Sequence, residues 1–199
     1  MPVLPQRTLL GMIAVFVLGL CRPAFAGKGA LAAEREVDVF VEDHASVSPA
    51  MFYRARVQAS ELLDRVGVRV TWKSGSPPKE GGCRTVIALV IEDAAPPELK
   101  PDVPALTHLG DGSIRVFYSR IRPALLTSPS LAPTLLAQVF AHEIGHSLQG
   151  LNRHSESGTM KAHWNVVDYR AMRDRQLGFS TMDAALILAG FERACPAGQ

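Results

Sequence analysis

Residues 85–91 (TVIALVI) most strongly constrain how this chain can fold, because no polar side chain interrupts the segment after Thr85. A continuous apolar run of this kind, rich in β-branched residues, is typical of a strand in the middle of a sheet. Alternation of apolar and polar side chains predicts further strands at 36–42, 68–72 and 114–118. The sequence therefore predicts a sheet with residues 85–91 near its centre.

Three helices are expected from apolar residues that recur at helical spacing. They cover about 50–66, 135–149 and a segment that starts at Ser180, where Asp183 three residues later resembles a capping box. Residues 151–165 show no periodicity and are expected to form an irregular loop. The expected order of elements is strand, helix, strands, helix, loop and helix.

The composition fits one globular core. The chain has 199 residues, of which 47% are apolar and 20% charged, so it is unlike a disordered, collagen-like or polytopic membrane protein and too short for two ordinary domains. Its formal charge of +2 has no basic block behind it, so nucleic acid is not expected as a partner. We expect a monomer with a single folded domain.

The N-terminus carries a predicted secretory signal peptide at residues 1–26. Arg7 precedes an apolar run at 9–20, and Ala24 and Ala26 place small residues where a signal peptidase cleaves. This run has 12 residues, whereas a bilayer core needs about 20, which favours cleavage after Ala26 over a permanent anchor. Residues 27–199 would then form a secreted or periplasmic domain with no stable membrane anchor.

Cleavage after Ala26 would also remove Cys21 and leave Cys83 and Cys195. Disulfides persist in the compartments that secreted proteins reach, so a bridge between Cys83 and Cys195 is one expectation. Two free thiols are the alternative, because the sequence alone does not place the two Cα atoms within bonding reach.

The segment AHEIGH, which begins at Ala141, carries the strongest chemical signal in this sequence. His142 and His146 lie about 40° apart around a helix, so both imidazoles can bind one ion. Glu143 lies about 60° from His146 on the same side, where its carboxylate can act as the general base of metal-assisted hydrolysis. The alternative is a helix with two solvated histidines and a surface glutamate.

A catalytic zinc ion normally takes three protein ligands and leaves its fourth position open, so a third ligand is required. His154 is the best candidate, because Gly150 can end the helix in the left-handed conformation and let the chain return toward the ion. An ordinary loop histidine is the alternative interpretation of His154. The reserve candidates for the third ligand are His163, His108, His44 and Glu156.

The segment HEIGHSLQGLNRHSESGTM, which begins at His142, resembles the metzincin zinc peptidases, and the order of elements is similar across most of the chain after the signal peptide. The resemblance implies an α+β fold with a twisted, mostly parallel sheet of about four to five strands, an antiparallel edge strand, an active-site helix and a C-terminal helix. It also implies that His142, His146 and His154 bind Zn²⁺, that Glu143 is the catalytic base, and that Met160 forms the Met-turn beneath the metal.

The spacing departs from the usual metzincin pattern, H-E-x-x-H-x-x-G-x-x-H, by one extra residue before the glycine and one before the last histidine. Strict register would place Asn152 at the third ligand. We interpret the additions as a helix and a loop that are each one residue longer. Gly150 then ends the helix, and His154 lies where the chain comes back toward the ion. Ser155 and Met160 resemble the His-Ser and Met-turn segments of matrixin-type members, which favours His154.

The resemblance implies a secreted zinc-dependent endopeptidase that hydrolyses a protein or peptide substrate with a zinc-activated water and Glu143 as base. It also implies that 114–118 is the antiparallel edge strand, along which an extended substrate would lie. The alternative is a secreted zinc-binding or interaction module of the same fold that has lost turnover, because the longer spacing could misplace the third ligand. Retention of Glu143 favours the enzyme, since a purely structural site uses four protein ligands and needs no base.

Overall fold

The computed structural model describes residues 35–78 and 85–194. The predicted signal peptide at residues 1–26 lies outside the described residues, and so do Cys83 and Cys195 with their predicted disulfide. No helix in the described part of the chain is long and apolar enough to cross a membrane.

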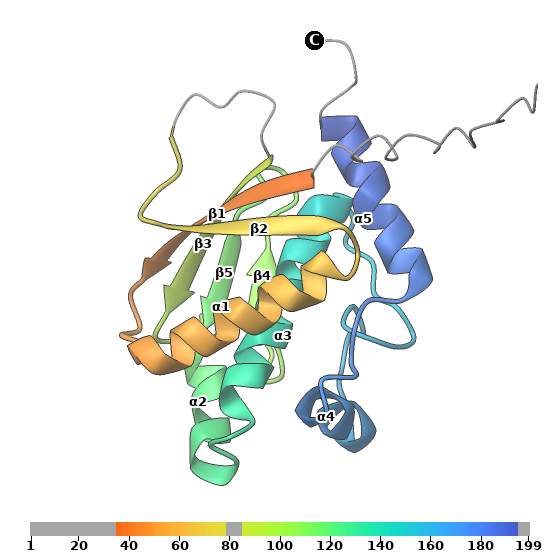
Figure 1. Cartoon of the computed structure of the whole chain (residues 1–199). Coiled ribbons are helices and arrows are strands. Elements are labelled where there is room, and N and C mark those ends of the chain that lie inside the picture. The colour runs from red at the N-terminus through yellow and green to blue at the C-terminus, as the bar shows by residue number, and fades with distance from the viewer. Residues whose placement is uncertain (1–34, 79–84, 195–199) are drawn as a thin grey trace, which may run out of the picture. The chain divides into compact units, whose positions relative to one another are not determined.

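A five-stranded sheet in the order β2-β1-β3-β5-β4 forms the centre of the described fold (Figure 1). All neighbouring strands run parallel except β4, which pairs with β5 in the antiparallel direction. The expected mostly parallel sheet is confirmed, and β3 is central as its apolar sequence predicts. The strands are β1 (Arg35–Asp43), β2 (Val68–Ser74), β3 (Thr85–Glu92), β4 (Ala105–Thr107) and β5 (Ile114–Phe117).

The antiparallel edge strand is β4, so the expectation that 114–118 forms this edge is wrong. Strand β5 pairs with β3 on one side and with β4 on the other, which makes it an interior strand. The pattern of the sequence does not reveal β4, because its three residues are too few to show alternation. Tyr118 does not continue β5 but begins helix α2 (Tyr118–Thr127). The spacing of apolar residues in the sequence does not predict this helix either.

Helices α1 (Pro49–Asp64) and α3 (Ala132–Gln149) pack against one another and against the sheet (Figure 1). Ser48 caps α1 with its side-chain oxygen, and Pro49 occupies the first turn, where its missing N–H leaves no hydrogen bond unmade. Helix α3 ends at Gly150 in the left-handed conformation that its sequence predicts. The predicted helices in these two regions are therefore confirmed.

The C-terminal part of the described chain contains α4 (Val166–Arg173) and α5 (Thr181–Ala194). At the start of α5, Asp183 N donates to Ser180 Oγ and Ser180 N donates to Asp183 Oδ2, which is the predicted capping box. The eight residues of α4 are fewer than the roughly 11 over which helical periodicity is recognised, so the sequence pattern does not reveal this helix.

Alternate residues of the central strands form the core beneath α1 and α3. Val39, Ile87 and Leu89 are fully buried, whereas Val86 and Ala88 on the other face of β3 are only partly buried. One face of the sheet therefore carries most of the apolar contact with the helices. Leu136, Phe140, Ile144 and Leu148 recur every four positions along α3 and belong to this core.

Helix α5 crosses α3 in backbone contact at Gly190. A Cβ atom at this position would lie 1.7 Å from the carbonyl oxygen of Leu148 and 2.8 Å from its carbonyl carbon. Both atoms belong to the α3 backbone, so no side-chain movement can relieve the overlap. Gly190 therefore sets how closely α5 approaches the end of α3.

Replacing Gly190 should test this contact. Gly190→Ala should lower the free energy of unfolding by more than about 2 kcal/mol, because α5 must move away from α3. Urea denaturation followed by far-UV circular dichroism measures this change. Gly178→Ala is the matched control, since no atom lies within 4 Å of a Cβ at that position. An equal loss of stability in both variants would contradict the backbone contact.

Candidate metal centre

His142 and His146 lie one turn apart on α3, and both line the same cleft. Residues four apart share one face of a helix, so the two rings approach each other. Their Nε2 atoms are 3.0 Å apart, and both residues are buried. The pair therefore presents two ring nitrogens to one point.

His154 joins this pair from the loop that follows α3. Gly150 has a φ angle of 62°, which turns the chain back along the helix. One potential ligand nitrogen from each of the three histidines lies within 4.8 Å of the other two. The His154 ring is centred 5.3 Å from the ring of His142 and 5.0 Å from that of His146. The structure thus brings together the three histidines that the sequence predicts as ligands.

The reserve candidates for the third ligand do not join the cluster. Among the described His, Cys, Asp and Glu residues, the three histidines are the only group of three or more that could hold one ion. His163 instead lies 3.4 Å from a carboxylate oxygen of Asp102, and Asn152 lines the cleft beside the cluster. The residues outside the group include His44, His108 and Glu156.

Backbone carbonyl groups fix the tautomer of both histidines on α3. His142 Nδ1 donates to the carbonyl oxygen of Thr159 at 2.8 Å, and His146 Nδ1 donates to that of Leu151 at 2.9 Å. A carbonyl oxygen only accepts, so Nδ1 carries the proton and Nε2 keeps its lone pair. Two such lone pairs at 3.0 Å repel each other, and a cation bound to both removes this repulsion.

This set of donors suits zinc. Nitrogen ligands bound at about 2.0–2.1 Å to a tetrahedral ion are about 3.3 Å apart, close to the 3.0 Å between the two Nε2 atoms. Burial lowers the pKa of His142 to about 4, and burial also lowers the pKa of His146 and of His154. All three imidazoles are therefore neutral near pH 7, which is the form that binds a metal.

Glu143 lies next to this pair with its side chain against β4. Thr107 Oγ1, at the end of β4, donates to Glu143 Oε2 at 2.6 Å. Burial raises the pKa of Glu143 to about 7, and the hydrogen bond from Thr107 acts in the opposite direction. A carboxyl group that titrates near neutrality therefore lines the cleft beside the imidazoles, where it can accept and return a proton. The sequence pattern does not reveal Thr107, because β4 is too short to be recognised.

Met160 lies fully buried beneath α3 at the level of Gly145. A Cβ atom on Gly145 would lie 2.6 Å from Met160 Sδ, so the sulfur packs directly against the helix between the two histidines. Met160 thus forms the floor below the pair. Its equivalence to the metzincin Met-turn stays a prediction.

A buried carboxylate on α5 anchors the loop that carries His154. Asp183 Oδ1 accepts hydrogen bonds from Arg153 Nη1 at 2.9 Å and from Ser155 Oγ at 2.5 Å, on either side of His154. Ser180 Oγ donates to the other oxygen at 2.6 Å. Although burial alone would raise it, these hydrogen bonds lower the pKa of Asp183, so the carboxylate is ionised at neutral pH. The sequence marks Asp183 only as a capping residue.

The histidine cluster opens into a cleft of about 590 Å³, which is a volume typical of ligand-binding sites. The cleft follows the face of α3 that carries Leu135, Val139 and the two histidines, and β4 borders it. Trp164 also lines it, and its ring meets the His142 ring edge-on at 5.7 Å between centroids. The cleft therefore joins the candidate metal ligands to an apolar helix face.

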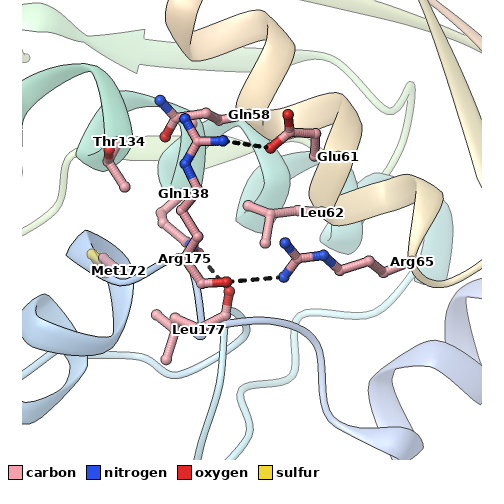
Figure 2. A pocket seen from close by; sticks show the side chains of 10 residues that line it. Gln58, Glu61, Leu62, Arg65, Thr134, Gln138, Met172, Arg175 and Leu177 are labelled. Carbon is pink, nitrogen blue, oxygen red and sulfur yellow. Dashed lines mark hydrogen bonds and ion pairs between the residues drawn. The ribbon is translucent and has the colours of Figure 1, made fainter.

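A much smaller cavity lies between α1, α3 and the segment after α4 (Figure 2). Its volume is about 20 Å³, enough for about one water molecule. Arg65 Nη1 donates to the carbonyl oxygen of Arg175 at 3.2 Å, and Arg175 Nη1 lies 3.4 Å from Glu61 Oε2. None of the predicted site residues lines this cavity.

No family model matches this chain, and no curated protein matches it. Among solved structures, its fold is similar to the crystal structure of a zinc-dependent peptidase from Methanocorpusculum labreanum (strain Z). The TM-score is 0.55 at 14% sequence identity, and the match covers 76% of this chain and 99% of that chain. This similarity shows a shared fold, whereas function depends on the residues of the site.

The metal-free protein should show opposite pH effects at His142 and Glu143. Between pH 7 and pH 5 the unfolded chain protonates His142 but the folded chain does not, so this histidine destabilises the fold as the pH falls. As the pH falls, Glu143 takes up its proton at a higher pH in the folded chain than in the unfolded chain. Glu143 therefore destabilises the fold as the pH rises.

Two variants separate these effects. From pH 5 to pH 7, the stability of Glu143→Gln relative to wild type should rise by about 2 kcal/mol, and that of His142→Asn should fall by a similar amount. Urea denaturation in the presence of a chelator measures both. If the stability of both variants relative to wild type changed in the same direction between pH 5 and pH 7, the burial of one of the two groups would be contradicted.

The geometry also predicts which residue is the third ligand. Loss of a residue that only hydrogen-bonds to a metal ligand weakens metal binding by about 10- to 100-fold. Loss of a direct ligand in His154→Ala should therefore weaken zinc binding by at least about 100-fold. Asn152→Ala, the control at the strict-register position, should bind zinc as wild type does. Competition against a chromogenic zinc chelator measures both affinities. The reverse result would exclude His154 as a ligand.

Proposed function

We propose that this protein is an exported zinc-dependent endopeptidase. The observation that carries the proposal is the convergence of three neutral imidazoles beside Glu143 at the wall of a large cleft. The similarity of the fold to a zinc-dependent peptidase supports it. The predicted signal peptide at residues 1–26 supports export.

His142, His146 and His154 would hold the ion in this proposal. A zinc ion with three protein ligands lowers the pKa of water and polarises a carbonyl group. Glu143 takes a proton from the attacking water and returns it to the leaving amine, for which a pKa near neutrality is suitable. The hydrogen bond from Thr107 holds the Glu143 carboxyl group in one orientation during both steps.

The number of ligands favours an enzyme over a zinc-binding module without turnover. Structural zinc sites are closed by four protein ligands, whereas catalytic sites use three and leave one position open. Within the described parts of the chain, no fourth His, Cys, Asp or Glu belongs to the cluster. An open position beside a buried carboxyl group is what hydrolysis requires.

A peptide substrate would lie along β4. This strand is the edge of the sheet, and all of its residues line the cleft. An exposed strand edge binds an extended peptide through backbone hydrogen bonds, without regard to most side chains. Because Thr107 of β4 contacts Glu143, a peptide paired with this edge passes next to the general base.

The role of Glu143 is tested by Glu143→Gln, which keeps the size of the side chain and its contact with Thr107. The variant should bind zinc as tightly as wild type but cleave unfolded protein substrates at least about 100-fold more slowly, since the base is lost. Metal analysis and a proteolysis assay measure the two properties. A wild-type protein that binds one zinc ion and cleaves no member of a broad substrate panel would favour the binding module instead.

A further inference from the structure

Arg120 on α2 lines the cleft that contains the histidine cluster and Glu143. Its Nε atom is buried and has no hydrogen-bond partner. Within the described ranges 35–78 and 85–194, Arg120 forms no ion pair with an acidic side chain. This Nε is closed to solvent, so a molecule in the cleft would have to bind Arg120 through its Nη groups.

The neighbouring arginines differ from Arg120 because their carboxylate partners lie within the protein. Arg115 Nε donates to Glu92 Oε1 at 2.8 Å. Arg122, two residues after Arg120 on the same helix, pairs with Asp93. Arg120 is therefore the member of this group whose guanidinium remains available to a bound molecule.

Apolar side chains line the route from the histidines to Arg120. Val139 and Leu135 lie one and two turns before His142 on the cleft face of α3, and Ile121 lies next to Arg120 on α2. Helix α2 packs against α3, so the two sets of side chains belong to one continuous wall.

The acidic groups that line the cleft do not neutralise Arg120. They are Asp102 and Glu143, of which Asp102 lies 3.4 Å from His163 Nδ1 and Glu143 is bound to Thr107. The cleft therefore has an unpaired positive charge within reach of a peptide bound at the histidines. A substrate with negative charge near the scissile bond complements it.

We propose that Arg120 is a specificity-determining residue that binds a carboxylate of the peptide substrate in the cleft that contains the histidine cluster. This proposal rests on the peptidase function proposed above. The planar guanidinium presents parallel N–H donors that match the two oxygens of a carboxylate. The carboxylate belongs to a glutamate or aspartate side chain or to the C-terminus of a short peptide, which share the same chemistry.

Peptide binding tests this role independently of turnover. The zinc-loaded chain with Glu143→Gln is mixed with fluorescent peptides in which Glu, Gln or Lys is placed at each position in turn, with an amidated or a free C-terminus. Fluorescence anisotropy gives the dissociation constants. At one or more positions, Glu should bind at least about tenfold more tightly than Gln. A preference that depends only on the free C-terminus would identify that group as the source of the carboxylate.

Variants of α2 then assign the preference to one residue. Adding Arg120→Gln should reduce the preference for Glu over Gln to about onefold, and Arg120→Glu should shift it to Lys, because the charge of the subsite is reversed. Arg122→Gln is the matched control, since it removes an arginine from the same helix that already has a partner, and should keep the preference. Thermal unfolding verifies that each variant is folded.

Three results would overturn the proposal: no binding of any peptide, equal binding of Glu and Gln peptides to the Arg120 protein, or an unchanged preference after Arg120→Gln. The comparison of peptides needs no substitution at Arg120, so a variant that fails to fold does not prevent the test. Cleavage by wild-type protein is measured separately. An Arg120-dependent preference without cleavage would overturn the peptidase function but not the carboxylate subsite.

Discussion

The return of the chain after α3 is the constraint on which the candidate site depends. Residues 151–160 supply the third imidazole, the carbonyl groups that hold His142 and His146, and the sulfur packed below them. A helix by itself brings two ring nitrogens together but leaves their tautomers open. The returning segment adds the third imidazole, and its backbone carbonyl groups accept the Nδ1 protons of the pair, which leaves both Nε2 lone pairs for one cation.

Helix α5 holds both parts of this arrangement. Asp183 near its start binds the residues on either side of His154, and Gly190 further along lies against the backbone of α3. The loop ligand and the helix ligands are thus positioned by the same rigid element. Metal sites tolerate only small displacements of their ligands, and this shared support holds the loop so that His154 lies at the cluster.

The sheet contributes through its shortest strand. Because β4 rather than β5 is the edge, Thr107 reaches the carboxyl group of Glu143 and the edge borders the cleft. The same cleft extends along α3 to Arg120, so the groups that bind, react and select would lie on one continuous surface. The expectation that 114–118 is the edge came from the resemblance, and it failed because β4, whose three residues are too few to show alternation, pairs with β5 on its outer side.

The sequence by itself determined the chemistry that this protein can carry. Helical spacing places His142, Glu143 and His146 on one side of α3, and Gly150 permits the return of His154, because these relations depend on local backbone geometry. Only the tertiary structure decided what surrounds them. Thr107 lies 36 residues from Glu143 in the chain and Ser155 lies 28 residues from Asp183, and such hydrogen bonds form only when the sheet edge, α3 and α5 pack together.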